Sequence, residues 1–185
     1  MALYLTEILT GAVDRAAAEA LVERLGPAAS GAGGRLLEVQ VSEDLARIFF
    51  VAEDVDPARL TAGIAELGAA QTEPALVRLV GATVDAVRAR AGSSASHLVE
   101  WDFPAGLDME TYLARKKEKS PLYSQVPEVA FLRTYVREDM GKCLCLYDAP
   151  DDAAVVRARE VVTTPIDRLH RLAQPADATA LPSQP

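Results

Sequence analysis

The chain has 185 residues, half of them hydrophobic, with a formal net charge of −8 and a pI near 4.8. This acidic balance argues against nucleic acid and anionic membrane surfaces as partners, because both carry negative charge. No apolar run approaches the ~20 residues of a membrane-spanning helix. The first residues show no basic stretch before an apolar one, so we predict a cytoplasmic protein without a signal peptide.

Residues 1–82 predict a first small domain. Alternating β-forming residues indicate strands, whereas Asp14 and the pair Asp56–Pro57 are typical helix starts, because an aspartate side chain accepts from free backbone N–H groups. The expected elements are a strand over 3–9, a helix over 14–25, strands over 35–41 and 46–52, a helix over 56–68 and a strand over 74–80. This βαββαβ order is that of a ferredoxin-like domain.

Residues 97–173 predict the same order of elements a second time. The expected elements are a strand over 98–103, a helix over 108–119, strands over 129–137 and 142–147, a helix from 151 to about 162, and a strand over 166–172. Between the two domains, residues 83–96 are expected to form a connecting helix and a Gly/Ser linker. The tail 174–185 is rich in Ala and Pro without periodicity, so we expect it to be disordered.

A short motif relates the two predicted domains. VSED occupies residues 41–44 and VRED residues 136–139, a separation of 139 − 44 = 95 positions, which exceeds the ~20–50 residues of a solenoid unit. We therefore predict an α+β fold with two ferredoxin-like repeats. Helices cover one face of each sheet and the other face needs cover. We expect the sheets to pack together as an intrachain dimeric α+β barrel; alternatively the bare faces meet another chain, and a homodimer is compatible with either arrangement.

The second domain resembles a known family. The residues that carry the resemblance are HLVEWDFPAGL at 97–107, TYVREDMGKCLCLYDAPD at 134–151 and TPIDRLHRL at 164–172. They are similar to the small ferredoxin-like family of unknown function that includes nickel-binding proteins. The resemblance implies nickel as a cofactor. Many members carry a histidine just before the Tyr-Val pair, whereas this chain has Leu132–Arg133–Thr134, so the resemblance assigns nickel to no particular residue.

Differences between the two domains predict the ligand site. Strand alternation groups Arg133, Tyr135, Cys145 and Tyr147, whose counterparts in the first domain are Glu38, Gln40, Phe50 and Ala52. A guanidinium and a phenol could hold an anionic or carbonyl-bearing ligand. The alternative is a solvated Arg133 and an ordinary strand tyrosine. The predicted ligand-binding residues are Arg133, Tyr135, Cys145, Tyr147, Tyr112, Lys116 and Trp101, with Tyr112 and Lys116 on a basic helix that could gate the pocket.

Catalytic and metal-binding candidates are few. Tyr135 and His170 are the candidate catalytic groups, although a strand histidine is more often structural. Glu7 and Glu100 occupy equivalent places in the two domains. Their carboxylates could accept hydrogen bonds from a helix or loop backbone near a pseudo-twofold axis. Alternatively, they could bind a cation together with His170. Cys143 and Cys145 are expected to be reduced and to pack as small hydrophobic residues.

Three classes of function follow from these features. The first is a small-molecule-binding protein with one pocket in the second repeat, which could be a cofactor-independent enzyme of the cyclase, isomerase or oxygenase type. In that case the first repeat is the structural half. The second class is a nickel or other transition-metal-binding protein, and the third is a non-catalytic interaction module. The sequence leaves the substrate open.

Overall fold

The structure is a computed structural model that describes residues 1–11, 14–89 and 95–174. The first half of the chain contains β1 (Leu3–Leu9), α1 (Arg15–Gly31), β2 (Arg35–Val41), β3 (Arg47–Glu53), α2 (Pro57–Ala65), β4 (Ala70–Gln71), β5 (Ala75–Val80) and α3 (Val84–Ala89). The second half contains β6 (His97–Asp102), α4 (Met109–Lys119), the 3-10 helix η1 (Ser120–Gln125), β7 (Ala130–Arg137), β8 (Lys142–Asp148), α5 (Asp152–Val161) and β9 (Arg168–Arg171). Residues 92–94 of the predicted Gly/Ser linker 92–96, and the predicted disordered tail beyond residue 174, lie outside the described residues.

Aspartate caps fix where the main helices begin. Asp14, Asp56, Asp108 and Asp151 each accept a hydrogen bond from the backbone N–H three residues later. Each bond satisfies a donor that a helix N-terminus otherwise leaves free. The four long helices therefore start where the sequence predicts.

The strands form one closed antiparallel arrangement. Their order is β2-β3-β1-β5-β7-β8-β6-β9, with the short β4 paired to β1. The end of β9 returns to the end of β2, because Ser42 bridges Leu172 and the N–H of Ala173 donates to the carbonyl of Val41. The sheet of each half thus joins the other at both edges, within one chain.

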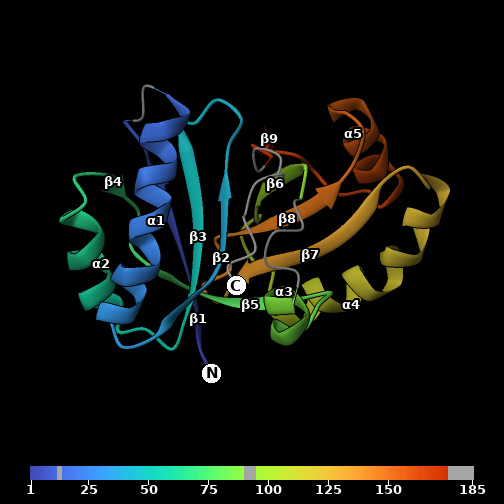
Figure 1. Cartoon of the computed structure of the whole chain (residues 1–185). Helices are drawn as coiled ribbons and strands as arrows, with labels where there is room; N and C mark the ends of the chain where they lie inside the picture. The colour runs from blue at the N-terminus through green and yellow to red at the C-terminus, as the bar shows by residue number, and fades with distance from the viewer. Residues whose placement is uncertain (12–13, 90–94, 175–185) are drawn as a thin grey trace.

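Helices cover the outside of this barrel at opposite ends. Figure 1 shows α1 and α2 against the strands of the first half and α4 and α5 against those of the second. Three apolar clusters result. One lies inside the barrel with members from both halves, among them Leu5, Phe49, Leu98 and Leu146, and one lies under the helices of each half.

Irregular backbone positions recur in both halves at the same separation of 95 residues. The register of β2 shifts between Leu36 and Glu38, and that of β7 shifts between Phe131 and Arg133. Leu45 and Met140, in the two hairpin turns, both have positive φ. Each register shift inserts one extra residue and so exchanges the two faces of the strand beyond it.

One helix differs from the sequence prediction. The pattern predicts an end near Leu25, with Gly26 and Pro27 as stop signals, but α1 continues to Gly31. Leu25 and Ala29 are fully buried against the first sheet. Burial of this face outweighs the backbone hydrogen bond that an internal proline removes. In the described part of the chain, no helix has the length and apolar character to cross a membrane.

Candidate functional site

Arg133 and Tyr135 point into the barrel, where both contact Glu38 of the first half. Arg133 Nε donates to Glu38 Oε2 at 2.9 Å and its Nη2 donates to Oε1. Tyr135 donates to Oε2 at 2.5 Å and Gln40 Nε2 donates to Oε1 at 2.7 Å. Arg133 is only 4% exposed and Glu38 9%. The carboxylate of Glu38 therefore occupies the place where an external anion was expected.

The predicted grouping of Arg133 and Tyr135 with Cys145 and Tyr147 is wrong. The register shift in β7 places Arg133 opposite Leu146 and Tyr135 opposite Leu144, both of which face the barrel. Cys145 and Tyr147 face the helices instead. A catalytic role for Tyr135 is also unsupported, because burial and the charge of Glu38 raise its pKa well above 10.

Among the described residues, the side chains that point into the barrel leave little space for a ligand. The cavity there, lined by residues such as Leu5, Phe49 and Tyr135, measures about 10 Å³. That volume is borderline even for one water molecule. The polar groups inside the barrel hold the two halves together and do not line a binding pocket.

Glu7 and Glu100 do face one another across the barrel, with a lysine between them. Lys142 Nζ contacts Glu7 and lies 2.6 Å from Glu100 Oε2. Glu100 also lies 2.8 Å from His170 Nε2 and 3.0 Å from Arg168 Nε. Burial alone would raise the pKa of Glu100, but the hydrogen bonds from His170, Arg168 and Lys142 hold it well below 4.5.

This cluster does not suit a metal ion. The ammonium group of Lys142 already supplies the positive charge between the two carboxylates. A metal cation at this place would therefore be repelled by Lys142. Among the described residues, no group of three or more His, Cys, Asp or Glu side chains is arranged to hold a metal. The two histidines are also separated. The ring of His170 packs at a tilt against Phe49 inside the barrel, whereas His97 contacts Asp152 of α5 on the outer face.

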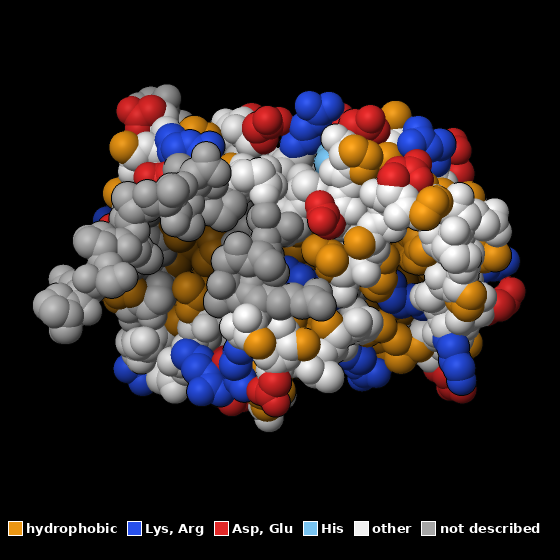
Figure 2. Space-filling view, turned by 45° about the vertical axis from the view of Figure 1, so that its right-hand side comes forward, with side chains coloured by type: hydrophobic (Ala, Val, Ile, Leu, Met, Phe, Trp, Pro, Cys, Tyr) orange, Lys and Arg blue, Asp and Glu red, His pale blue; other side chains and the backbone are white. Residues whose placement is uncertain are grey.

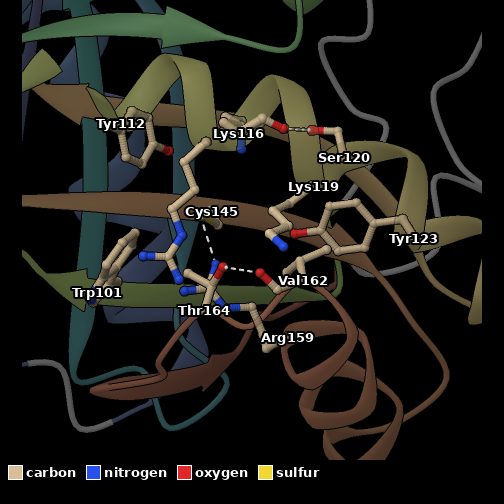
Figure 3. A pocket seen from close by; sticks show the side chains of 11 residues that line it. Trp101, Tyr112, Lys116, Lys119, Ser120, Tyr123, Cys145, Arg159, Val162 and Thr164 are labelled. Carbon is tan, nitrogen blue, oxygen red and sulfur yellow. Dashed lines mark hydrogen bonds between the residues drawn. The ribbon is translucent and has the colours of Figure 1, made fainter. Parts of the chain in front are cut away.

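A hollow lies instead between the outer face of the second sheet and its helices (Figure 3). It encloses about 390 Å³ of empty space including its open mouth, of which about 30 Å³ admits the centre of a water molecule. Its lining comes from β6, β8, α4, α5 and the segments after the two helices: Trp101, Tyr112, Arg115, Lys116, Lys119, Ser120, Tyr123, Cys145, Arg159, Val162 and Thr164. In Figure 2, Lys and Arg side chains show in recesses among hydrophobic ones on the right-hand side of the molecule.

Cys145 and Arg159 form the floor of the hollow. Arg159 Nη1 lies 3.4 Å from Cys145 Sγ and 3.2 Å from the hydroxyl of Tyr147, which in turn lies 2.9 Å from the hydroxyl of Tyr123. Arg159 Nη2 donates to the carbonyl of Pro165. Its Nε is buried and has no partner among the described residues.

The hollow is electropositive within an acidic protein. Among the described residues it is lined by Arg115, Lys116, Lys119 and Arg159 and by no carboxylate. Burial lowers the pKa of Lys116, whose Nζ is held by Thr134 Oγ1 at 3.1 Å and lies 4.0 Å from the centre of the Phe131 ring. Burial also opposes the charge on Arg159, but Cys145 and Tyr147 more than compensate and raise its pKa.

The two sulfurs differ in acidity. The hydrogen bond from Cys143 and, against the effect of burial, the charges of Arg159 and Lys116 lower the pKa of Cys145 well below 9.0. Burial and the neighbouring Cys145 raise the pKa of Cys143. Cys145 is therefore the more acidic of the two thiols.

Among the described residues of the first half, apolar side chains fill the positions that correspond to the floor of the hollow. Ninety-five residues before Cys145, Tyr147 and Arg159 stand Phe50, Ala52 and Ile64, all fully buried in an apolar cluster. The polar groups that distinguish the halves on this face thus gather in the second half.

The structure brings together four of the predicted ligand-binding residues, Trp101, Tyr112, Lys116 and Cys145, and places Tyr147 in contact with the floor. It separates Arg133 and Tyr135 from them. Arg159 was missed. Its signal is the helical spacing of Val155, Arg159 and Val162, which places an arginine on the buried face of α5.

One family profile matches part of this chain. The profile of a family described as "Nickel responsive protein SCO4226-like" matches residues 97–172, which is the second half alone. A search of curated proteins finds no match.

Solved structures share the fold of the whole chain. One is named "Putative Chlorite dismutase TA0507", with a TM-score of 0.56 and 14% identity, and covers 94% of this chain and 96% of its own. Another, from Lactobacillus acidophilus NCFM, is named a "putative monooxygenase", with a TM-score of 0.50 and 8% identity over 93% of each chain. At these identities the likeness shows only the fold, an α+β barrel with antiparallel strands.

We expect that loss of the buried ion pair between Glu38 and Arg133 strongly destabilises the fold. Replacing Arg133 with Met leaves a buried carboxylate unpaired, so we expect the free energy of unfolding in urea to fall by about 3–5 kcal/mol. The double variant Glu38→Met/Arg133→Met should regain part of the loss, while Arg78→Met, in an exposed pair with Glu138, should cost under about 1 kcal/mol. A double variant no more stable than Arg133→Met would contradict this.

We expect the ionisation of Glu100 to make the stability of the protein depend on pH. Because the folded-state pKa of Glu100 lies below 4.5, its stabilising contribution is present above that pH and is lost as the pH falls. Urea unfolding at a series of pH values should therefore show wild type and Glu100→Gln converging between about pH 5 and pH 2. The exposed control Glu66→Gln should stay parallel to wild type, and a constant gap for Glu100→Gln would count against the assignment.

Proposed function

We propose that the chain binds a small anionic molecule in the hollow of its second half. The observation that carries the proposal is the buried Arg159, whose Nε–H has no partner among the described residues. A buried donor without an acceptor costs free energy that a bound anion would recover. Three more cationic side chains at the same hollow, Arg115, Lys116 and Lys119, add a field that attracts negative charge.

The size of the hollow limits the ligand. With about 30 Å³ open to water centres, the site fits molecules of the size of formate, acetate or bicarbonate, and larger anions require the long side chains of Lys116 and Lys119 to move. The aromatic wall of Trp101 and Tyr112 suits an apolar substituent beside the charged group. If the protein is an enzyme, the sulfur of Cys145 and the hydroxyl of Tyr123 are the groups beside such a ligand.

We further infer that the chain consists of two diverged ferredoxin-like repeats, residues 1–82 and 97–173, of which the first is the structural half. The matched register shifts and positive-φ turns at a separation of 95 residues support this inference. The apolar packing around Phe50 and Ile64, where the second half has its hollow, supports the structural role of the first. A homodimer stays a prediction, and closure of the barrel within one chain means that no second chain is needed to cover the sheets.

The other two classes of function have less support. The filled barrel suits an interaction module, but the polar hollow outside it favours a ligand. The family profile suggests nickel, yet the two sulfurs, 3.8 Å apart, lie among cations, which disfavours a divalent metal. Titration with nickel chloride tests this alternative, and we expect no saturable heat below millimolar concentration.

Calorimetric titration of the full chain with formate, acetate, bicarbonate and sulfate at low chloride tests the proposal. We expect saturable binding of at least one anion, weakened at least about tenfold in Arg159→Met, because a hydrogen bond to a charged group contributes about 1.5–3 kcal/mol.

The matched control is Arg157→Met, two positions earlier on α5, where the guanidinium is exposed and paired with Glu128. It should bind like wild type. Equal affinity in Arg159→Met, or no binding of any of the four anions, would refute the proposal, and micromolar nickel binding would replace it with the metal alternative.

A further inference from the structure

Cys145 combines an unusual environment with access to the hollow. Its sulfur lies 3.3 Å from Thr134 Oγ1, which donates to it, 3.4 Å from Arg159 Nη1 and 3.8 Å from Cys143 Sγ. All these groups stabilise negative charge on sulfur, and the thiolate is the nucleophilic form of cysteine. A core cysteine that only fills space needs none of them.

The two cysteines differ in what can reach them. Both are buried on β8, but Cys145 lines the hollow and Cys143 does not. The narrow space above Cys145 admits one or two water-sized molecules. Glutathione and protein thiols are far too large to enter, whereas hydrogen peroxide is close to the size of water.

We propose that Cys145 is a site of oxidation by hydrogen peroxide, and that its sulfenate oxygen enters the hollow and accepts from Arg159. In this step the sulfur attacks one peroxide oxygen, a new S–O bond forms and the O–O bond breaks. The sulfur of the thiolate form loses two electrons, and the leaving hydroxide takes the proton of the newly bound oxygen, so that one sulfenate and one water molecule form. The unpartnered Nε–H of the buried Arg159 is a donor that the reduced side chain does not use.

Oxidation of Cys145 would regulate the site proposed above. The added oxygen takes up space in a hollow of molecular dimensions and engages the same guanidinium that holds the anion. The oxidised protein should therefore bind anions more weakly. A disulfide with Cys143 is a poor end product, because residues two apart on an extended strand lie near the upper limit of Cα separation for a disulfide.

The experiment treats the full chain with an equimolar amount of hydrogen peroxide at pH 6, without added carboxylate or phosphate. The treated protein is then unfolded in urea that contains dimedone, which labels sulfenic acids. The labelled protein is digested and analysed by mass spectrometry. We expect dimedone on Cys145 and unmodified Cys143. The rate at Cys145 should exceed that of the same cysteine in the urea-unfolded chain at least about tenfold, because ordinary thiols are almost fully protonated at this pH.

Arg159→Met should slow oxidation of Cys145 at least about tenfold, and the control Arg157→Met should leave it unchanged. The comparison of the two cysteines within wild type does not depend on any variant. Equal labelling of Cys143 and Cys145, or a native rate no faster than the unfolded one, would overturn the inference. Anion titration uses the reduced protein, so failure of the proposed function and failure of this inference are separate results.

Discussion

A buried ion pair between equivalent positions of the two halves organises this protein. Glu38 and Arg133 stand 95 residues apart, on strands whose registers shift at the same place, and they meet inside the barrel. Tyr135 and Gln40, the next equivalent pair, both donate to the same carboxylate. Two identical residues could not pair in this way, because like charges would face one another in a poorly solvated interior. The two halves thus supply complementary charges to the barrel interior.

This pairing explains where the candidate site is found. Arg133 and Tyr135 are bound to Glu38, and Lys142 links Glu7 to Glu100. These described polar groups of the interior therefore have partners, and the cavity beside Glu38 and Tyr135 has a volume of only about 10 Å³. The remaining functional groups lie on the opposite face of the second sheet. There Arg159 and Cys145 replace residues that are apolar in the first half, and α4 holds its basic side chains over them.

The order of elements was predictable because it depends on local signals: alternation, aspartate caps and the repeated hairpin motif. The faces of the strands were less predictable. Plain alternation places Arg133 with Cys145, and only the extra residue at Leu132 reverses this, a feature without a clear signal in one sequence. The continuation of α1 through Pro27 depends on burial of Ala29, which is a tertiary effect. Arg159 was within reach, since its helical spacing and its counterpart Ile64 both indicate a buried position.

We propose that Arg159 is available to a ligand, whereas Arg133 is held by Glu38. Side-chain NMR of the two Nε–H groups, assigned from the Arg159→Lys and Arg133→Lys variants, measures this directly during titration with sodium acetate. We predict a saturable shift of the Arg159 signal and a constant Arg133 signal. A shift of Arg133, with Arg159 unchanged, would place the ligand inside the barrel and contradict the account.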